Sequence, residues 1–101
     1  MSRPKTRFQI PQISSKTISV ASYNIYRSRL NKIASHGITN REEVLTNQSR
    51  VCEIVKSLVG DNKQQGRVFL SAVFYVLADT PNTEKTILYN EFQKYKDTIP
   101  Q

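Results

Sequence analysis

The segment from Val68 to Ala78 constrains the fold more than any other part of this 101-residue chain. Its apolar residues would lie on almost every side of a helix, which is the pattern of a buried helix rather than of one at a surface. Asp61 or Asn62 can cap this helix at its start. Because such a helix needs other helices to cover it, the sequence predicts an all-α domain built around a central helix.

A first helix is predicted from about Ser19 to Ser35. Its apolar residues follow the i, i+3, i+7, i+10 spacing of one helical stripe, at Tyr23, Tyr26, Leu30 and Ile33. Gly37 is suited to a left-handed C-cap. His36 is the single histidine and lies in the last turn, so we interpret it as a residue that complements the helix dipole rather than a catalytic one.

A second helical region is predicted to begin near Asn40, because Thr39 and Glu42 have the spacing of a capping box. The polar residues around Asn47 are poor in the middle of a helix and good as caps, so two interpretations are open. One is a continuous helix, and the other is a short helical turn followed by a helix from about Asn47. In both, an amphipathic helix ends near Val59.

A fourth amphipathic helix is predicted after the break at Pro81. Asn82 or Thr83 can cap it, and it ends at about Lys96. The positive and negative charges of its side chains, Lys85 among them, nearly cancel. We therefore interpret its outer surface as solvated structure rather than as a binding site. Its apolar face is expected to consist of Ile87, Leu88, Phe92 and Tyr95.

The N-terminal segment, residues 1–16, is predicted to be a flexible basic arm. It contains two prolines and several basic side chains and has no apolar periodicity. Such a segment buries too little apolar surface to offset its ordering entropy. The domain organisation that we expect is this arm followed by one compact four-helix domain at residues 17–98.

Charge is distributed unevenly along the chain. Eight basic residues and no acidic residue lie at or before Arg41, whereas seven basic and eight acidic residues follow, giving net charges of +8 and −1. A local excess of positive charge attracts polyanions, of which nucleic acid is the commonest inside cells. The alternative is a basic segment that only promotes solubility.

Residues with catalytic or metal-binding chemistry are sparse. Cys52 is the single cysteine, and no Cys/His cluster or glycine-rich phosphate loop is present. One His and one Cys do not supply the base, nucleophile and orienting groups that catalysis needs, so we predict no enzyme activity and no cofactor. No apolar stretch is long enough for a signal peptide or a membrane span, so an intracellular location (nuclear, cytoplasmic or virion-associated) is expected.

Candidate nucleic-acid contacts lie in the arm and at two helix surfaces, which we expect to converge on one side of the bundle. Phosphate contacts suit the first helix, while long donors at the start of the central helix could reach phosphates or base edges. For Gln64, a solvated side chain at an exposed helix start is an equally good interpretation. The candidates are Lys16 in the arm, Arg27, Arg29 and Lys32 on the first helix, and Lys63, Gln64 and Arg67 on the central helix.

Two stretches resemble the N-terminal SAM-like, or core-binding, domain of phage integrases and other tyrosine recombinases. They are SKTISVASYNIYRSRLNKIASHGI and LTNQSRVCEIVKSLVGDNKQQGRVFLSAVFYVLA. The matching features are a hydroxyl residue before a Tyr-x-x-x-Leu helix, then a short helix and a polar turn. A helix like Thr-x-x-x-x-Leu-Ser-Ala-hydrophobic follows, matched by Gly66 to Val73. Similar stand-alone domains are found in large DNA viruses.

The resemblance implies a compact four-helix SAM-like bundle that clasps duplex DNA. Its contacts would come from Tyr26, Arg27 and Arg29 on the first helix and from Lys63, Gln64 and Arg67 on the central one; without the resemblance, packing is the preferred role for Tyr26. The family's catalytic Arg, Lys, His-x-x-Arg and Tyr nucleophile are missing, since Thr39 stands three residues after His36. Gly66 stands where the family often has Thr, which puts base reading there in doubt.

The predicted function is therefore a non-catalytic module that binds the phosphate backbone of double-stranded DNA. No membrane and no small-molecule substrate are expected as partners. The main alternative is a protein-interaction or virion-structural module whose basic arm docks on an acidic partner. Such a module would expose a contiguous apolar patch of more than a few hundred Å². Enzyme activity is the least favoured of the three interpretations, and would need a deep pocket around Tyr75, His36 or Cys52.

Overall fold

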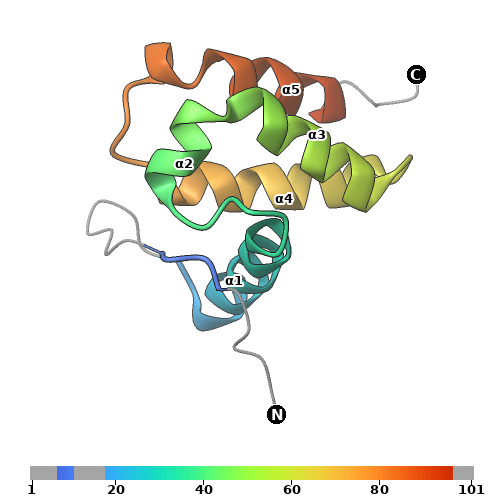
Figure 1. Ribbon diagram of the computed structural model, residues 1–101. Coiled ribbons are helices and arrows are strands. Elements are labelled where there is room, and N and C mark those ends of the chain that lie inside the picture. The colour runs from blue at the N-terminus through green and yellow to red at the C-terminus, as the bar shows by residue number, and fades with distance from the viewer. Residues whose placement is uncertain (1–6, 11–17, 97–101) are drawn as a thin grey trace.

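Helices make up the regular structure in the ranges that the computed structural model describes, residues 7–10 and 18–96 (Figure 1). The predicted all-α class is confirmed. Within these ranges no helix has the length and apolar character needed to cross a membrane. The elements are α1 (Val20–Ala34), α2 (Arg41–Thr46), α3 (Gln48–Val59), α4 (Lys63–Val76), the 3₁₀-helix η1 (Asn82–Glu84) and α5 (Thr86–Lys96).

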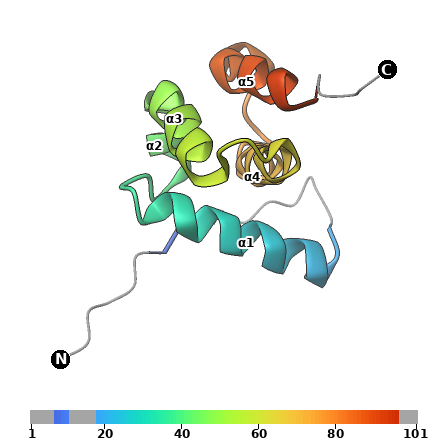
Figure 2. The same ribbon diagram turned by 90° about the vertical axis from the view of Figure 1, so that its right-hand side faces the viewer.

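Helix α4 is the central helix, as the sequence predicts. It lies end-on in Figure 2, with α1 below it, α5 above it and α3 at its side, and all three pack against it. Asn62 is its N-cap, since the side-chain oxygen accepts a hydrogen bond from the backbone N–H of Gln65. Burial along α4 extends from Phe69 to Val76 on several sides, which explains the continuous apolar pattern.

Helix α1 packs on α4 through the predicted stripe. Leu30 and Ile33 are fully buried, and the half-buried ring of Tyr26 lies 5.7 Å from the ring of Tyr75 between centroids. The hydroxyl of Ser19 accepts a hydrogen bond from the N–H of Ser22 at 3.1 Å and caps the helix. These contacts leave one side of α1 against the bundle and the rest in solvent.

The start of α2 corrects the predicted capping box by one residue. Asn40, not Thr39, is the N-cap, and its Oδ1 accepts a hydrogen bond from the N–H of Glu43 at 2.9 Å. Glu43 in turn accepts hydrogen bonds from the N–H and the hydroxyl of Thr39 at 2.7 and 2.8 Å. Thr39 with Glu42 and Asn40 with Glu43 both have the i, i+3 spacing, so spacing alone does not choose between Thr39 and Asn40 as the N-cap. Of the two interpretations of this region, the one with a break at Asn47 is confirmed.

Residues at the start of α5 correct two further predictions. The caps predicted at Asn82 and Thr83 belong to η1, and α5 begins only at Thr86. Ile87 is 49% exposed rather than part of the apolar face, because it lies one residue, or about 100°, away from the buried Leu88.

Lys85 is buried, whereas its charge was expected to be solvated. The side chain is 7% exposed, and its Nζ donates a hydrogen bond to the carbonyl of Leu77 at 3.1 Å. Nζ also lies 5.8 Å from the centroid of the Phe74 ring. Because Leu77 is the C-cap of α4, the ammonium group complements the negative end of that helix dipole.

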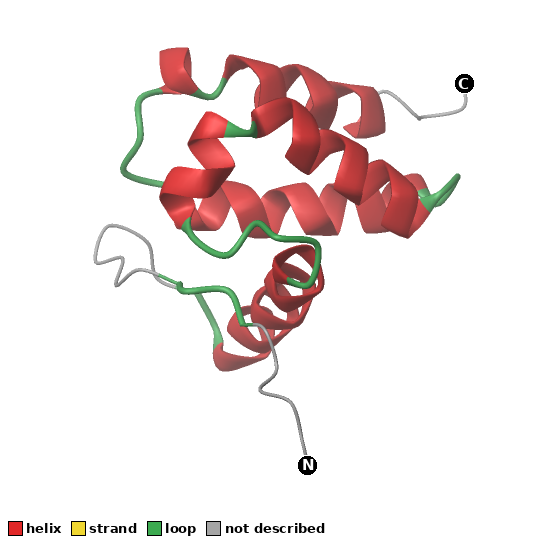
Figure 3. Cartoon of the chain, in the orientation of Figure 1, coloured by secondary structure: helices red, strands yellow, loops and turns green. Residues whose placement is uncertain are grey.

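Residues 7–10 correct the prediction of a flexible arm. Phe8 is 5% exposed and belongs to the core, and its N–H donates a hydrogen bond to Oδ1 of Asn31 at 2.9 Å. The N–H of Gln9 donates to the carbonyl of Thr39 at 2.7 Å. Figure 3 shows this segment as a loop beside α1. An apolar anchor therefore holds these four residues, while the rest of the predicted arm lies outside the described residues.

Candidate nucleic-acid interface

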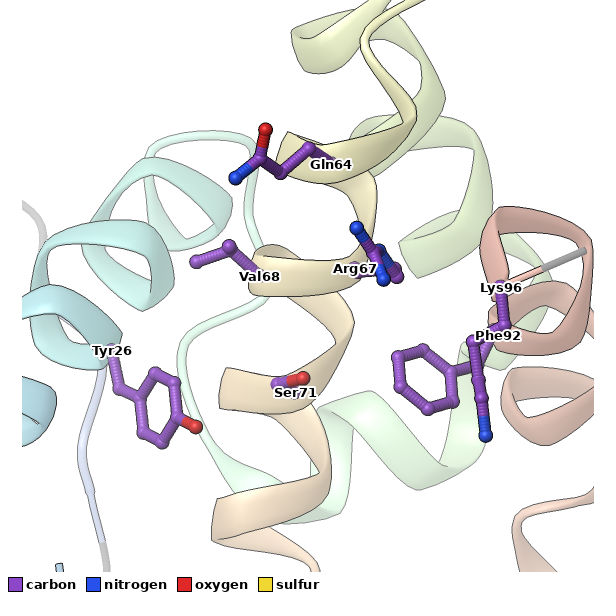
Figure 4. A pocket seen from close by; sticks show the side chains of 7 residues that line it. All are labelled: Tyr26, Gln64, Arg67, Val68, Ser71, Phe92 and Lys96. Atoms are coloured by element: carbon purple, nitrogen blue, oxygen red, sulfur yellow. The ribbon is translucent and has the colours of Figure 1, made fainter. Parts of the chain in front are cut away.

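Three helices enclose an open groove of about 380 Å³, here called the three-helix groove (Figure 4). Its floor is one stripe of α4, where Gln64, Arg67, Val68 and Ser71 follow the i, i+3, i+4, i+7 spacing. Tyr26 of α1 forms one wall. Phe92 and Lys96 of α5, one helical turn apart, form the other.

The three-helix groove combines aromatic rings with positive charge. Arg67 and Lys96 are both exposed, and Nζ of Lys96 lies 5.5 Å from the centroid of the Phe92 ring. Among the described residues that line this groove, none is a carboxylate. Two cations without an acid in this lining create a local positive potential, which favours an anionic ligand.

A second groove, of about 400 Å³, runs along α1 and is here called the α1 groove. Arg27 and Lys32 supply its cations, and amide and hydroxyl groups supply the rest of its surface. One amide is already engaged, since Oδ1 of Asn31 accepts the N–H of Phe8. The lining residues are Asn24, Arg27, Ser28, Asn31, Lys32 and Ser35.

The two grooves lie on different sides of α1, so the predicted convergence of the cations on one surface is wrong. Tyr26, Gln64 and Arg67 meet in the three-helix groove. Arg27 follows Tyr26 by about 100° around the helix, and Lys32 lies further round, so both point away from α4. Because consecutive residues of a helix point in different directions, the neighbours Tyr26 and Arg27 lie in different grooves.

Arg29 belongs to neither groove. Its guanidinium carbon lies 5.7 Å from the centroid of the Phe69 ring, in cation–π range. Its Nε is buried and has no hydrogen-bond partner within the described structure. The side chain is half-buried, so part of the guanidinium group is held against the protein rather than presented to a ligand.

The two remaining predicted contacts have different outcomes. Lys63 is exposed at the first residue of α4 but does not line the three-helix groove. Lys16 lies outside the described residues. The structure thus groups five of the predicted side chains into two sets: Tyr26, Gln64 and Arg67 in one, Arg27 and Lys32 in the other.

Ion pairing does not neutralise the cations of the two grooves. On α5, Lys94 forms an ion pair with Glu91 at 3.5 Å, on a different side of the helix from Lys96. Arg27, Lys32, Arg67 and Lys96 therefore have no carboxylate partner in the described part of the chain.

Sequence reasoning missed Phe92, Lys96 and Ser71 as possible contacts. The signal available was the i, i+4 spacing of Phe92 and Lys96, which places both on one face of α5. That spacing does not reveal which helix the face meets. Only the packing of α5 beside α4 brings it opposite Tyr26.

Gly66 is buried in the contact between α4 and α5. A Cβ atom at this position would overlap the ring of Tyr95, whose Cζ would lie 2.8 Å away. Position 66 therefore faces the Tyr95 ring of α5. Its lack of a side chain lets α5 pack close enough to form the wall of the three-helix groove.

Cys52 lies in the core and is 8% exposed. Burial raises the pKa of its thiol to about 11, so the thiol is protonated near neutral pH. His36 is exposed in the turn after α1. Among the described residues, no group of three or more His, Cys, Asp or Glu side chains is arranged to hold a metal ion.

Comparisons of the chain with protein-family models, with curated proteins and with solved structures found no match. The resemblance to recombinase core-binding domains therefore stays a prediction. What bears on function is the geometry of the two grooves.

Proposed function

We propose that this chain is a non-catalytic module that binds double-stranded DNA through the phosphate backbone. The observation that carries the proposal is the pair of grooves flanking α1, whose four cations have no carboxylate partner among the described residues. Cations in such positions release counterions from DNA when they neutralise phosphates, and this release drives binding.

The α1 groove supports contacts to phosphates alone. Its lining consists of cationic, amide and hydroxyl side chains, which are the groups that commonly donate to phosphate oxygens. Arg27 and Lys32 lie five residues apart on one helix and can reach phosphates along one strand. In the three-helix groove, Arg67 and Gln64 add donors at the first turns of α4, where the helix dipole also favours an anion.

A four-helix SAM-like arrangement is part of the same proposal. Helices α1, α3, α4 and α5 would be its four helices, with α2 as the short element that precedes α3. The contacts implied by the recombinase resemblance then come from α1 and the start of α4. Three of the implied side chains, Tyr26, Gln64 and Arg67, line one groove.

Exposed apolar side chains give less support to a protein-interaction module. In the described ranges, the large exposed ones are divided among α1, α3 and α5. On α1, Val20 and Ile25 are five residues apart, so they lie about 140° apart around the helix.

The test is a fluorescence-anisotropy titration of a blunt 20-base-pair duplex at several salt concentrations. If three or four phosphates are contacted, log K should fall with log salt at a slope of about −3 to −4. A slope near zero would contradict the proposal.

Charge reversal locates the phosphate contacts. Each phosphate contact contributes about a factor of ten at 0.1 M salt, so Arg27→Glu with Lys32→Glu should weaken binding by about fiftyfold or more and reduce the salt slope by about 2. The matched control is Lys56→Glu with Lys94→Glu, which changes the net charge equally at exposed positions outside both grooves. Equal weakening by both pairs would reject the α1 groove as a contact surface.

A further inference from the structure

We propose that the three-helix groove holds one unstacked nucleotide of the bound DNA, with its base between the aromatic walls and its phosphate on the cations. This inference rests on the proposed DNA-binding function and goes beyond it, because phosphate contacts with paired duplex need no aromatic groove. The juxtaposition that carries it is Tyr26 opposite Phe92, with Arg67 and Lys96 at the same opening.

The dimensions of the groove suit a single nucleotide. Its volume of about 380 Å³ lies at the lower end of the range for small-ligand sites, about 300–1,000 Å³. Ser71 forms the middle of the floor in Figure 4, and its small side chain leaves space between the two walls. A planar base can enter that space edge-on.

Aromatic side chains supply the surface that a base needs. Tyr26 is held by its contact with Tyr75, and the Phe92 ring packs edge-on against Phe74 at 5.3 Å between centroids. Both rings are therefore supported from behind and remain half-exposed toward the groove. Stacking on rings placed in this way does not depend on base identity, because every base has a π-face.

The cations are placed for the phosphate of the same nucleotide. Arg67 projects from the floor helix on the side of Phe92, and Lys96 stands beside the Phe92 ring, so both positive charges lie near the α5 wall of the groove. Gln64, one turn before Arg67, adds an amide that can donate or accept a hydrogen bond at a base edge. The α1 groove has comparable volume, but none of its described lining residues is aromatic, so this lining offers no surface for stacking a base.

The experiment compares four probes at one salt concentration. Three are duplexes of equal length: one fully paired, one with a single unpaired central thymidine, and one with an abasic residue at that position. The fourth is free thymidine monophosphate. The abasic duplex keeps the phosphate and the local flexibility, so the difference between the second and third probes measures the base alone.

We expect the unpaired thymidine to raise affinity about tenfold over the abasic probe, the size typical of one base–aromatic stack. Ser71→Leu fills the floor without changing charge and should remove this preference. Lys96→Ala should weaken binding of the thymidine probe several-fold. Lys94→Ala is the matched control, because it removes the same charge from the same helix outside the groove and should leave binding unchanged.

The outcomes separate this inference from the proposed function. Salt-dependent binding of the paired duplex with no gain from the unpaired thymidine would overturn the inference and leave the proposed function standing. Failure to bind any duplex would overturn both. Free thymidine monophosphate binding as tightly as the thymidine probe would assign the groove to a soluble nucleotide instead. Circular dichroism checks that each variant is folded. If Ser71→Leu does not fold, the test rests on Lys96→Ala, which changes an exposed position.

Discussion

The two grooves beside α1 are built in different ways. The described lining of the α1 groove consists of five residues of α1 and its C-cap Ser35, whereas the three-helix groove takes its lining from α1, α4 and α5. Among the described residues, the α1 groove has cations and amides but no aromatic ring, and the three-helix groove has cations, an amide and aromatic rings. A surface that depends on one helix is set by local sequence, while a groove that combines aromatic and cationic groups here required packing between distant segments.

Because of this difference, the two grooves suit different parts of a nucleic acid. Phosphates repeat along every nucleic-acid strand, so a row of donors on a single helix suffices to contact them. Placing a ring on each side of a base requires two walls at a set separation. In this protein the separation depends on how closely α5 approaches α4, and Gly66 permits that approach.

Removal of the Phe8 side chain is the strongest test of whether the α1 groove depends on α1 alone. Phe8 is in the core, and its N–H is bonded to Asn31, one of the groove residues. Phe8→Ala should lower the free energy of unfolding by about 3 kcal/mol, because it leaves a cavity and releases residues 7–10. Chemical denaturation measures the loss, with Gln9→Ala as the control at an exposed neighbour. A loss below about 1 kcal/mol would show that this segment does not support the groove.

Addition of one methyl group at Gly66 should disturb the packing of α5 on α4, which forms one wall of the three-helix groove. Gly66→Ala places a Cβ against the ring of Tyr95, and overpacking of this kind typically destabilises a protein by about 1–3 kcal/mol. The better helix propensity of Ala offsets up to about 1 kcal/mol of that loss. Thermal unfolding measures the effect, and Gln65→Ala on the same turn should change stability by less than about 0.5 kcal/mol. If Gly66→Ala proves stabilising, close approach of α5 is not what forms the groove wall.

Protonation of Glu43 should give the smallest effect, at the start of α2, where the carbonyl of Thr39 also accepts the N–H of Gln9. Hydrogen bonds from the N–H and the hydroxyl of Thr39 hold the pKa of Glu43 below its ordinary value of 4.5. The stabilising contribution is therefore present above about pH 4.5 and is lost as the pH falls through the lowered pKa. The difference in Tm between the wild type and Glu43→Gln should be larger at pH 6 than at pH 3. A pH-independent difference would mean that the carboxylate charge is not involved, and Thr39→Val should show a smaller change of the same sign.

Local patterns predicted most of the helices because their determinants lie within a few residues. The caps at Ser19 and Asn62 and the break at Asn47 follow from side chains that bond to nearby backbone groups. The prediction at Thr39 was wrong because Asn40 competes for the same role. The burial of Lys85 could not be predicted, since its partner is the carbonyl of Leu77, at the end of another helix.

Part of the candidate site could also be predicted from the sequence. The cations of α1 and of the start of α4 were identified, but their expected convergence was wrong because Arg27 turns away from Tyr26 by the rotation of the helix itself. Phe92 and Lys96 were missed because nothing within α5 shows what lies opposite them. Phe8 was missed because one apolar residue among polar neighbours carries no periodic signal.

The sequence by itself determined the all-α class, the buried character of α4 and the uninterrupted positive charge of α1, because backbone hydrogen bonding and apolar periodicity act over short stretches of chain. Only the tertiary structure decided that Tyr26 and Phe92 line opposite sides of one groove, that Lys96 joins Arg67, and that Arg27 is excluded from their groove. Those placements depend on how closely helices distant in sequence can pack, and here that closeness depends on the missing side chain at Gly66.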